Sequence, residues 1–180
     1  MGDDNEASVS QSGTSNVATV TQDDDNVATV AQGGDNNVAT VTQQTGNTAN
    51  VDQGGDNNTA TVNQKFAFNA PSIGNTATIV QSGDYNEATT NQDDNNTATV
   101  TQLGIGTAVD PNTVLISQYN NGDVATATQL GGSGNSIVIS QEECCTGNTG
   151  VDNYATAIQD GSNNSTTITQ LPGVVGPPLP

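Results

Sequence analysis

The sequence contains almost no basic or aromatic side chains. Its 180 residues include one base, Lys65, no histidine and no tryptophan, against 19 acidic residues, so the formal net charge is -18. Nucleic acids and anionic membranes are bound chiefly through Lys and Arg, so we expect neither as a partner. Only 31% of the residues are hydrophobic, which excludes a large apolar core of the ordinary globular kind.

Long apolar segments and a disulfide framework are also missing. No apolar run approaches the roughly 18–20 residues of a membrane-spanning helix, so we expect no membrane insertion. No cationic and apolar leader precedes Asp3, and we interpret the chain as an already processed form without a signal peptide. Cys144 and Cys145 are adjacent, which is typical of a surface pair, since no other thiolate or imidazole could complete a soft-metal site.

Catalytic chemistry has few side chains available. Without histidine, and with a single base, the chain offers carboxylates alone for proton transfer and no activated nucleophile. We therefore predict no catalytic residues, no cofactor and no enzymatic activity.

A seven-residue repeat, Asn-x-Ala-x-Val-x-Gln, runs through most of the chain. Every copy ends with Gln, and the first residue is Asn in all copies except one, which has Asp. All six prolines lie outside the seven-residue copies, as expected if each copy donates backbone N–H groups to a sheet. The copies begin at residues 5, 16, 26, 37, 47, 58, 75, 86, 96, 112, 123, 135, 153 and 164.

Each copy has the pattern of a β-strand. Alternate side chains of a strand point to opposite faces, so the Asn, Ala, Val and Gln positions share one face. That face is nearly invariant along the chain, whereas the other carries varied Thr, Ser and Val residues, and we assign the regular face to the interior. Turns of four and three residues alternate in the first half, so two strands and two turns form one rung of about 21 residues.

Stacked rungs predict an all-β fold, a two-sheet β-solenoid of about seven rungs with cross-β character. We assign residues 1–4 to an N-terminal extension, 5–170 to the repeat domain and 171–180 to a Pro-rich tail. Residues 65–74, 103–111 and 142–152 are insertions between strands. Asn and Gln side chains are expected to form hydrogen-bonded columns along the stack, for example Asn16, Gln22, Asn26, Gln32, Asn37, Gln43, Asn58 and Gln64.

The repeat with its turn resembles curlin, the subunit of curli, the secreted amyloid fibre of bacterial biofilm matrix. The motif Gln-x-Gly-x-x-Asn-x-Ala-x-Val-x-Gln occupies residues 11–22, 32–43 and 53–64. Both strands of a rung here use Asn and Ala, whereas the family's first strand usually begins with Ser and carries larger aliphatics. The resemblance implies a secreted structural protein of cell-surface fibres that serves adhesion and the biofilm matrix.

The two terminal rungs are the expected surfaces of polymerisation. Their strands keep the regular inward pattern and contain no proline, so an exposed row of N–H and C=O groups can recruit another chain. We predict a homopolymer that grows head to tail, with possible contacts to neighbouring filaments through the insertions. The residues assigned to these ends are Asn5, Ala7, Val9, Gln11, Asn164, Thr166, Ile168 and Gln170.

Two alternatives and one metal site stay open at this stage. The amide columns could serve a monomeric solenoid, and its outward Thr-x-Thr steps resemble those of solenoid ice-binding proteins. Asp35, Asp56 and Asp84 occupy the third position of successive four-residue turns, where stacking brings like charges together. Calcium would offset that repulsion, although it normally takes six or more oxygen ligands, and a solvated acidic edge is the simpler interpretation.

Overall fold

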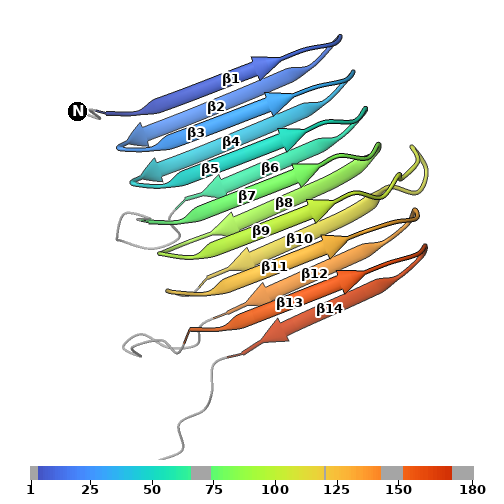
Figure 1. Cartoon of the computed structure of the whole chain (residues 1–180). Coiled ribbons are helices and arrows are strands. Elements are labelled where there is room, and N and C mark those ends of the chain that lie inside the picture. Colours follow the sequence, from blue (N-terminus) through green and yellow to red (C-terminus); the bar gives the residue numbers. More distant parts are fainter. Residues whose placement is uncertain (1–3, 66–73, 120, 143–151, 172–180) are drawn as a thin grey trace, which may run out of the picture.

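The computed structural model of the chain describes residues 4–65, 74–119, 121–142 and 152–171. All regular structure in these residues is β-strand, and they contain no helix, so none that is long and apolar enough to cross a membrane. The all-β prediction is confirmed. The strands stack from one end of the molecule to the other (Figure 1), with bounds β1 Glu6–Gln11, β2 Val17–Asp24, β3 Val27–Gln32, β4 Val38–Thr45, β5 Thr48–Gln53, β6 Thr59–Gln64, β7 Thr76–Gln81, β8 Asn86–Gln92, β9 Thr97–Gln102, β10 Asn112–Gln118, β11 Val124–Gln129, β12 Ser136–Gln141, β13 Tyr154–Gln159 and β14 Ser165–Gln170.

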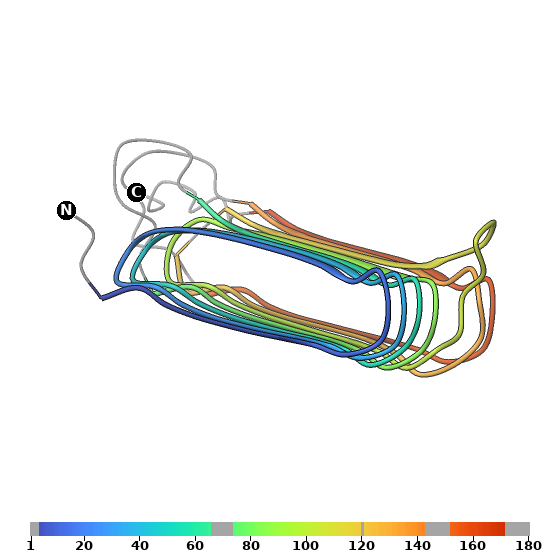
Figure 2. The same cartoon turned by 90° about the horizontal axis from the view of Figure 1, so that it is seen from above.

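The strands form two parallel seven-stranded sheets. The odd-numbered strands make one sheet, in the order β1-β3-β5-β7-β9-β11-β13, and the even-numbered strands make the other, in the order β14-β12-β10-β8-β6-β4-β2. Consecutive strands of the chain therefore lie in opposite sheets, and the chain traces a flattened ring when viewed along the stack (Figure 2). The fold is a β-solenoid of parallel stacked strands, as the repeat predicts.

Equivalent repeat positions lie side by side in each sheet. Ala7 of β1 pairs with Ala28 of β3, 21 residues later in the chain. The pairing survives the insertion at residues 65–74, because Ala49 of β5 still pairs with Ala77 of β7. A slip of one residue would turn every inward side chain outward, so the buried face holds the register.

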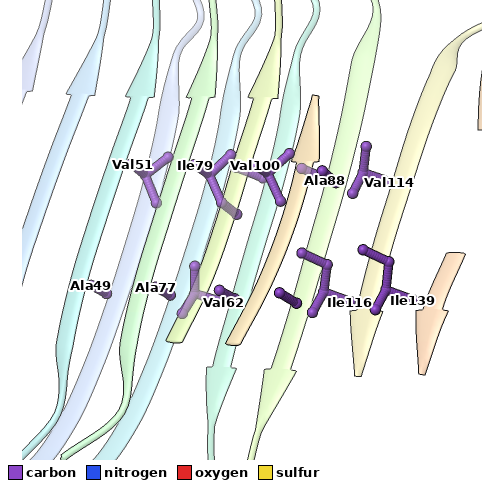
Figure 3. Close-up of a cluster of buried hydrophobic side chains, with 14 of the residues drawn as sticks. Ala49, Val51, Val62, Ala77, Ile79, Ala88, Val100, Val114, Ile116 and Ile139 are labelled. Atoms are coloured by element: carbon purple, nitrogen blue, oxygen red, sulfur yellow. The ribbon is translucent and has the colours of Figure 1, made fainter. Parts of the chain in front are cut away.

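The core is a thin layer of small aliphatic side chains between the two sheets (Figure 3). The Ala, Val and Ile residues at inward positions of the interior strands are almost completely buried, including Val51, Ile79 and Ile139, each 0% exposed. Burying a Val or Ile side chain stabilises a fold by about 1.5–3 kcal/mol, so many small contributions replace one large core. Thr90 of β8 is the polar exception among the inward core positions of the buried strands.

The residue before each repeat copy commonly has a left-handed backbone. Asn36 and Asn57 have φ values of 58°, and Gly46, at the same point of another turn, has 67°. Asn and Gly adopt this region at lower cost than other residues, because they have a short polar side chain or none. The frequent Asn, Asp and Gly at the ends of the linkers therefore specify the direction in which the chain re-enters the sheet.

The structure describes one of the three predicted insertions completely. Residues 103–111 leave the solenoid after β9 and return to β10 through a bridge between Thr107 and Asp110, with Ile105 and Val109 exposed. Gly106 and Asn112 donate backbone hydrogen bonds to the preceding turn, so the insertion is anchored at its base. Most of the other two insertions, both cysteines and most of the C-terminal tail lie outside the described residues.

Candidate functional site: the amide columns and the terminal rungs

The glutamines that close the strands form continuous hydrogen-bonded columns, one in each sheet. In the odd-numbered sheet the side-chain Nε2 of Gln11 donates to Oε1 of Gln32, at 2.6 Å, and the column continues to Gln159. In the even-numbered sheet Gln22 donates to Gln43 at 3.1 Å, and this column continues to Gln170. All of these bonds run in one direction, because each Nε2 points toward the C-terminal end of the stack.

The same side chains also tie the two sheets together. Nε2 of Gln32, in β3, donates to the carbonyl oxygen of Val17 in β2, and Gln43 of β4 donates to Val27 of β3, each at 3.1 Å. Each of these carboxamides therefore uses one N–H along the stack and the other across it. The interior glutamines are at most 2% exposed, so these bonds satisfy polar groups that would otherwise be buried at a cost of about 1–3 kcal/mol each.

The asparagines also stack, with side-chain amide bonds at some rungs, such as Asn75 to Asn47 at 3.2 Å, and with bonds to the backbone of the next rung at others. Oδ1 of Asn16 accepts the backbone N–H of Asn37, and Oδ1 of Asn37 accepts that of Asn58, both at 2.9 Å. The Nδ2 group of Asn37 is used instead on the turn carbonyls of Gly33 and Gly55. Asn is one methylene shorter than Gln, so its oxygen reaches the main chain of the next rung more readily than the next side chain.

The three turn aspartates take part in a related column. Asp35 accepts the backbone N–H of Thr14 at 2.6 Å, and Asp56 and Asp84 accept those of Asp35 and Asp56 at 2.8 and 2.9 Å. Each carboxylate thus has a backbone N–H donor from the turn of the preceding rung. In the part of the chain that the structure describes, no group of three or more His, Cys, Asp or Glu residues could hold a metal ion. The described aspartates therefore form no such group, and a solvated acidic edge stays the simpler interpretation.

A column of turn glycines lies beside the aspartates. A Cβ atom added to Gly13 would lie 2.0 Å from the carbonyl oxygen of Gly34, which is closer than Cβ atoms approach in proteins. The same contact recurs from each turn to the next, in the series Gly13, Gly34, Gly55, Gly83, Gly104, Gly132 and Gly161. The sequence shows a recurrent glycine, two residues after Gln in most turns and three after Gln129, but the close stacking of these glycines was not predicted.

The terminal strands leave both sheets with open edges in the described part of the chain. β1 and β2 pair only with β3 and β4, and β13 and β14 pair only with β11 and β12. We call β1 with β2 the first rung and β13 with β14 the last rung. Val9 of β1 is 48% exposed although it occupies an inward position, whereas the equivalent Val30 of β3 is 1% exposed.

The predicted end residues lie on these two rungs. Asn5, Ala7, Val9 and Gln11 are exposed, and Asn164, Thr166, Ile168 and Gln170 are half-buried. The inward side chains of the first rung thus contact solvent where those of an interior strand contact the next rung.

The outward hydroxyl groups are divided between the two sheets. Thr99 of β9 lies beside Thr126 of β11 in one sheet, and Thr19 of β2 lies beside Thr40 of β4 in the other. Between and around them the outer faces carry Asp52, Asn63, Glu87 and Asn91, and Asn63 donates a hydrogen bond to Asn91 at 3.0 Å. The structure therefore contains two separate threonine patches.

The fold and its hydrogen-bonded columns define a class, the β-solenoid repeat proteins. The curlin associated repeat is recognised in three segments of the chain, residues 2–23, 74–104 and 149–171. These three segments therefore contain curlin-like repeats, as the motif predicts. The family consists of structural fibre subunits, which agrees with the prediction that this protein is not an enzyme. No curated protein and no solved structure matched the chain.

Proposed function

We propose that this protein is the structural subunit of an extracellular amyloid-like fibre, in which solenoids of seven rungs stack end to end. The fibre serves as a scaffold of the biofilm matrix and the cell surface and supports adhesion. The observation that carries this proposal is the pair of open sheet edges on the first and last rungs. Such edges are unpaired rows of hydrogen-bonding groups, which soluble monomers normally cover or disrupt.

The backbone of β1 supports stacking in a specific way. Glu6 and Ser12 donate their N–H groups to Asn26 and Gln32 in the neighbouring strand and turn. Because alternate residues of a strand direct their N–H groups to opposite sides, those of Ala7 and Val9 point away from β3. A second subunit could therefore extend the sheet without breaking any bond of the first.

The surface supports fibre formation as well. The acidic turns and the net charge of -18 keep the subunits soluble before assembly. The insertion at residues 103–111 projects from the turn edge and exposes Ile105 by 63% and Val109 by 94%. We assign this insertion to the fibre surface, where it contacts neighbouring filaments.

Electron microscopy and fibre diffraction test the proposal. We expect the purified chain to form unbranched fibres in negative stain, and aligned fibres to give a meridional reflection near ~4.8 Å, the spacing of paired strands. A chain that stays monomeric at high concentration under all conditions would contradict the proposed function.

A double substitution, Ala7→Pro with Val9→Pro, tests the role of the first rung. Proline removes the two outward N–H donors, and it is tolerated on an edge strand when the lost donor faces solvent. The variant should therefore fold but elongate slowly or not at all. Ala7→Ser with Val9→Thr is the matched control, since it keeps both donors and should elongate at nearly the wild-type rate.

A further inference from the structure

One aspartate in the last rung lies directly before a glycine. Asp160 and Gly161 form the single Asp-Gly step of the chain, and they open the turn between β13 and β14. Both residues are exposed, and no Cβ shields the backbone nitrogen of the glycine. Among the described residues, a Cβ added to Gly161 would meet only Asn164 Nδ2, at 3.7 Å. The space beside this turn is therefore open to water.

The side chain of Asp160 is turned back onto this nitrogen. The Gly161 N–H donates a 2.9 Å hydrogen bond to Oδ1 of Asp160. A carbon–oxygen bond is about 1.23 Å long, so the nitrogen lies no more than about 4.1 Å from Cγ of the same carboxyl group. The two atoms that would join to close a five-membered imide ring are thus already near each other.

The interior turn aspartates have a different arrangement, as Asp84 shows. Its carboxylate accepts the backbone N–H of Asp56 at 2.9 Å. The N–H of the next residue, Tyr85, donates to the carbonyl oxygen of Asp56 at 3.0 Å. The neighbouring rung therefore engages both groups that would have to react at Asp84, whereas at Asp160 the two groups are bonded to each other.

We propose that Asp160–Gly161 is a site of spontaneous modification, at which aspartate isomerises to isoaspartate through a succinimide. The Gly161 nitrogen attacks Cγ of the protonated carboxyl group, and a C–N bond forms while one carboxyl oxygen leaves as water with the proton of the nitrogen. Water then opens the imide at either carbonyl. Opening at Cγ restores aspartate, and opening at the main-chain carbonyl leaves the chain running through Cβ and Cγ. The two steps release and consume one water molecule and need no other reactant.

The product changes the last rung because isoaspartate adds one atom to the main chain. The preceding rung holds the turn at two points: Gly161 accepts a 2.7 Å hydrogen bond from Asn135 Nδ2, and the Asn163 N–H donates to Ser133 at 2.9 Å. In the described residues β14 pairs with β12 alone, so no second strand holds it in register. Isomerisation should therefore loosen β14 and leave the interior strands intact. The inference concerns the folded subunit and does not depend on the proposed fibre function.

Incubation of the folded wild-type protein in water enriched in oxygen-18 tests the proposal. Each passage through the imide introduces one solvent oxygen, so the peptide that contains Asp160 should gain mass. A protease that cleaves before aspartate but not before isoaspartate should gradually lose its cut at this residue. Asp84 should incorporate the label at least about tenfold more slowly, because its reacting groups are held apart. The single Asn-Gly step, Asn121–Gly122, can form the same ring with loss of ammonia, so the products are assigned peptide by peptide.

Two variants at this residue separate the chemistry from the position in the fold. Asp160→Glu keeps the charge, but its imide would be a six-membered ring that closes far more slowly, so this variant should take up almost no label. Asp160→Asn keeps the size of the side chain and releases ammonia in place of water. It should react faster than wild type and gain the mass of a deamidated residue.

The unfolded chain supplies the reference for these rates. If Asp160 is labelled in urea but not in the folded protein, the turn protects the step and the proposal is wrong. Equal labelling of Asp84 and Asp160 in the folded protein would also overturn it, because the turn geometry would then have no effect.

Hydrogen exchange on aged protein tests the structural consequence. Backbone amides of β14 should exchange about tenfold faster or more in the isoaspartate form than in fresh protein, while those of β6 should be unchanged. Aged Asp160→Glu is the matched control and should keep the protection of fresh protein. Full protection of β14 in the isoaspartate form would show that the modification leaves the last rung intact, contrary to the proposal.

Discussion

The side-chain Nε2 of Gln32 donates a 2.8 Å hydrogen bond to Oε1 of Gln53, 21 residues later in the chain and one strand away in the same sheet. Neither side chain is more than 2% exposed. This contact is repeated through both sheets, and it makes the polar end of each strand as much a part of the interior as the alanines and valines. The stability of the fold should therefore depend on the amide columns as well as on apolar packing.

Replacing Gln53 by Leu tests the columns directly. The substitution preserves the approximate size of the side chain but leaves Nε2 of Gln32 and Oε1 of Gln81 without their partners in the buried column. We expect the free energy of unfolding of the monomer to fall by about 2–3 kcal/mol, measured by urea denaturation. Asn50→Thr, on the exposed face of the same strand, should change it by less than about 0.5 kcal/mol.

Thr90→Val should stabilise the monomer. The Thr90 side chain is 0% exposed, and its Oγ1 has no hydrogen-bond partner among the described residues. Its neighbours in the sheet are Val62 and Ile116. Valine has nearly the same shape and removes the unsatisfied hydroxyl, so we expect a gain of about 1–2 kcal/mol in urea denaturation. Thr89→Val, at the outward position beside it, is the control, and equal stability of wild type and Thr90→Val would contradict the prediction.

Asp93 should make the stability depend on pH. Burial, with a smaller contribution from the neighbouring charge of Asp94, raises the pKa of Asp93 from 3.8 to about 6. The folded protein therefore holds this proton more tightly than the unfolded chain, so the stabilisation is complete below pH 3.8 and is lost as the pH rises through about 6.

Thermal melts of wild type and Asp93→Asn between about pH 4 and pH 7 would measure this contribution. The variant carries no titrating group at this position, so its melting temperature should decrease less than that of wild type over the same range. Asp94→Asn should shift the wild-type transition to lower pH, because it removes the charge that raises the pKa of Asp93. Parallel curves for wild type and Asp93→Asn would show that Asp93 does not titrate in this range.

Calcium should have no specific effect through the turn aspartates. Asp35, Asp56 and Asp84 direct carboxylate oxygens at backbone N–H groups of the preceding turns and do not converge on one point. At fixed ionic strength we expect equal melting temperatures and equal assembly rates with calcium and with a chelator. A calcium-dependent increase that Asp56→Asn abolishes would reveal a metal site in these turns.

The sequence by itself determined the all-β class, the strand positions and the inward face. Asn, Ala, Val and Gln recur at every second position of each copy, which is the period of a β-strand. This period shows which side chains share one face of the strand. The alternation of turn lengths was enough to group strands in pairs and to predict a rung of about 21 residues, which is the separation of the paired Ala7 and Ala28. These features could be read because each depends on local spacing repeated many times.

Only the tertiary structure decided how the polar groups are bonded. The Asn16 side chain can bond either to the side chain or to the backbone of Asn37, and a difference in length of about one methylene decides between them. The choice depends on the distance between two stacked rungs, which the local sequence pattern does not contain. The same holds for the glycine column, because the 2.0 Å approach at Gly13 exists only when two turns stack. It also holds for the carboxylates, which are hydrogen-bonded in the turns and not gathered around a metal. Contacts between rungs depend on the rise of the solenoid, and that rise is set by the stacked sheets as a whole.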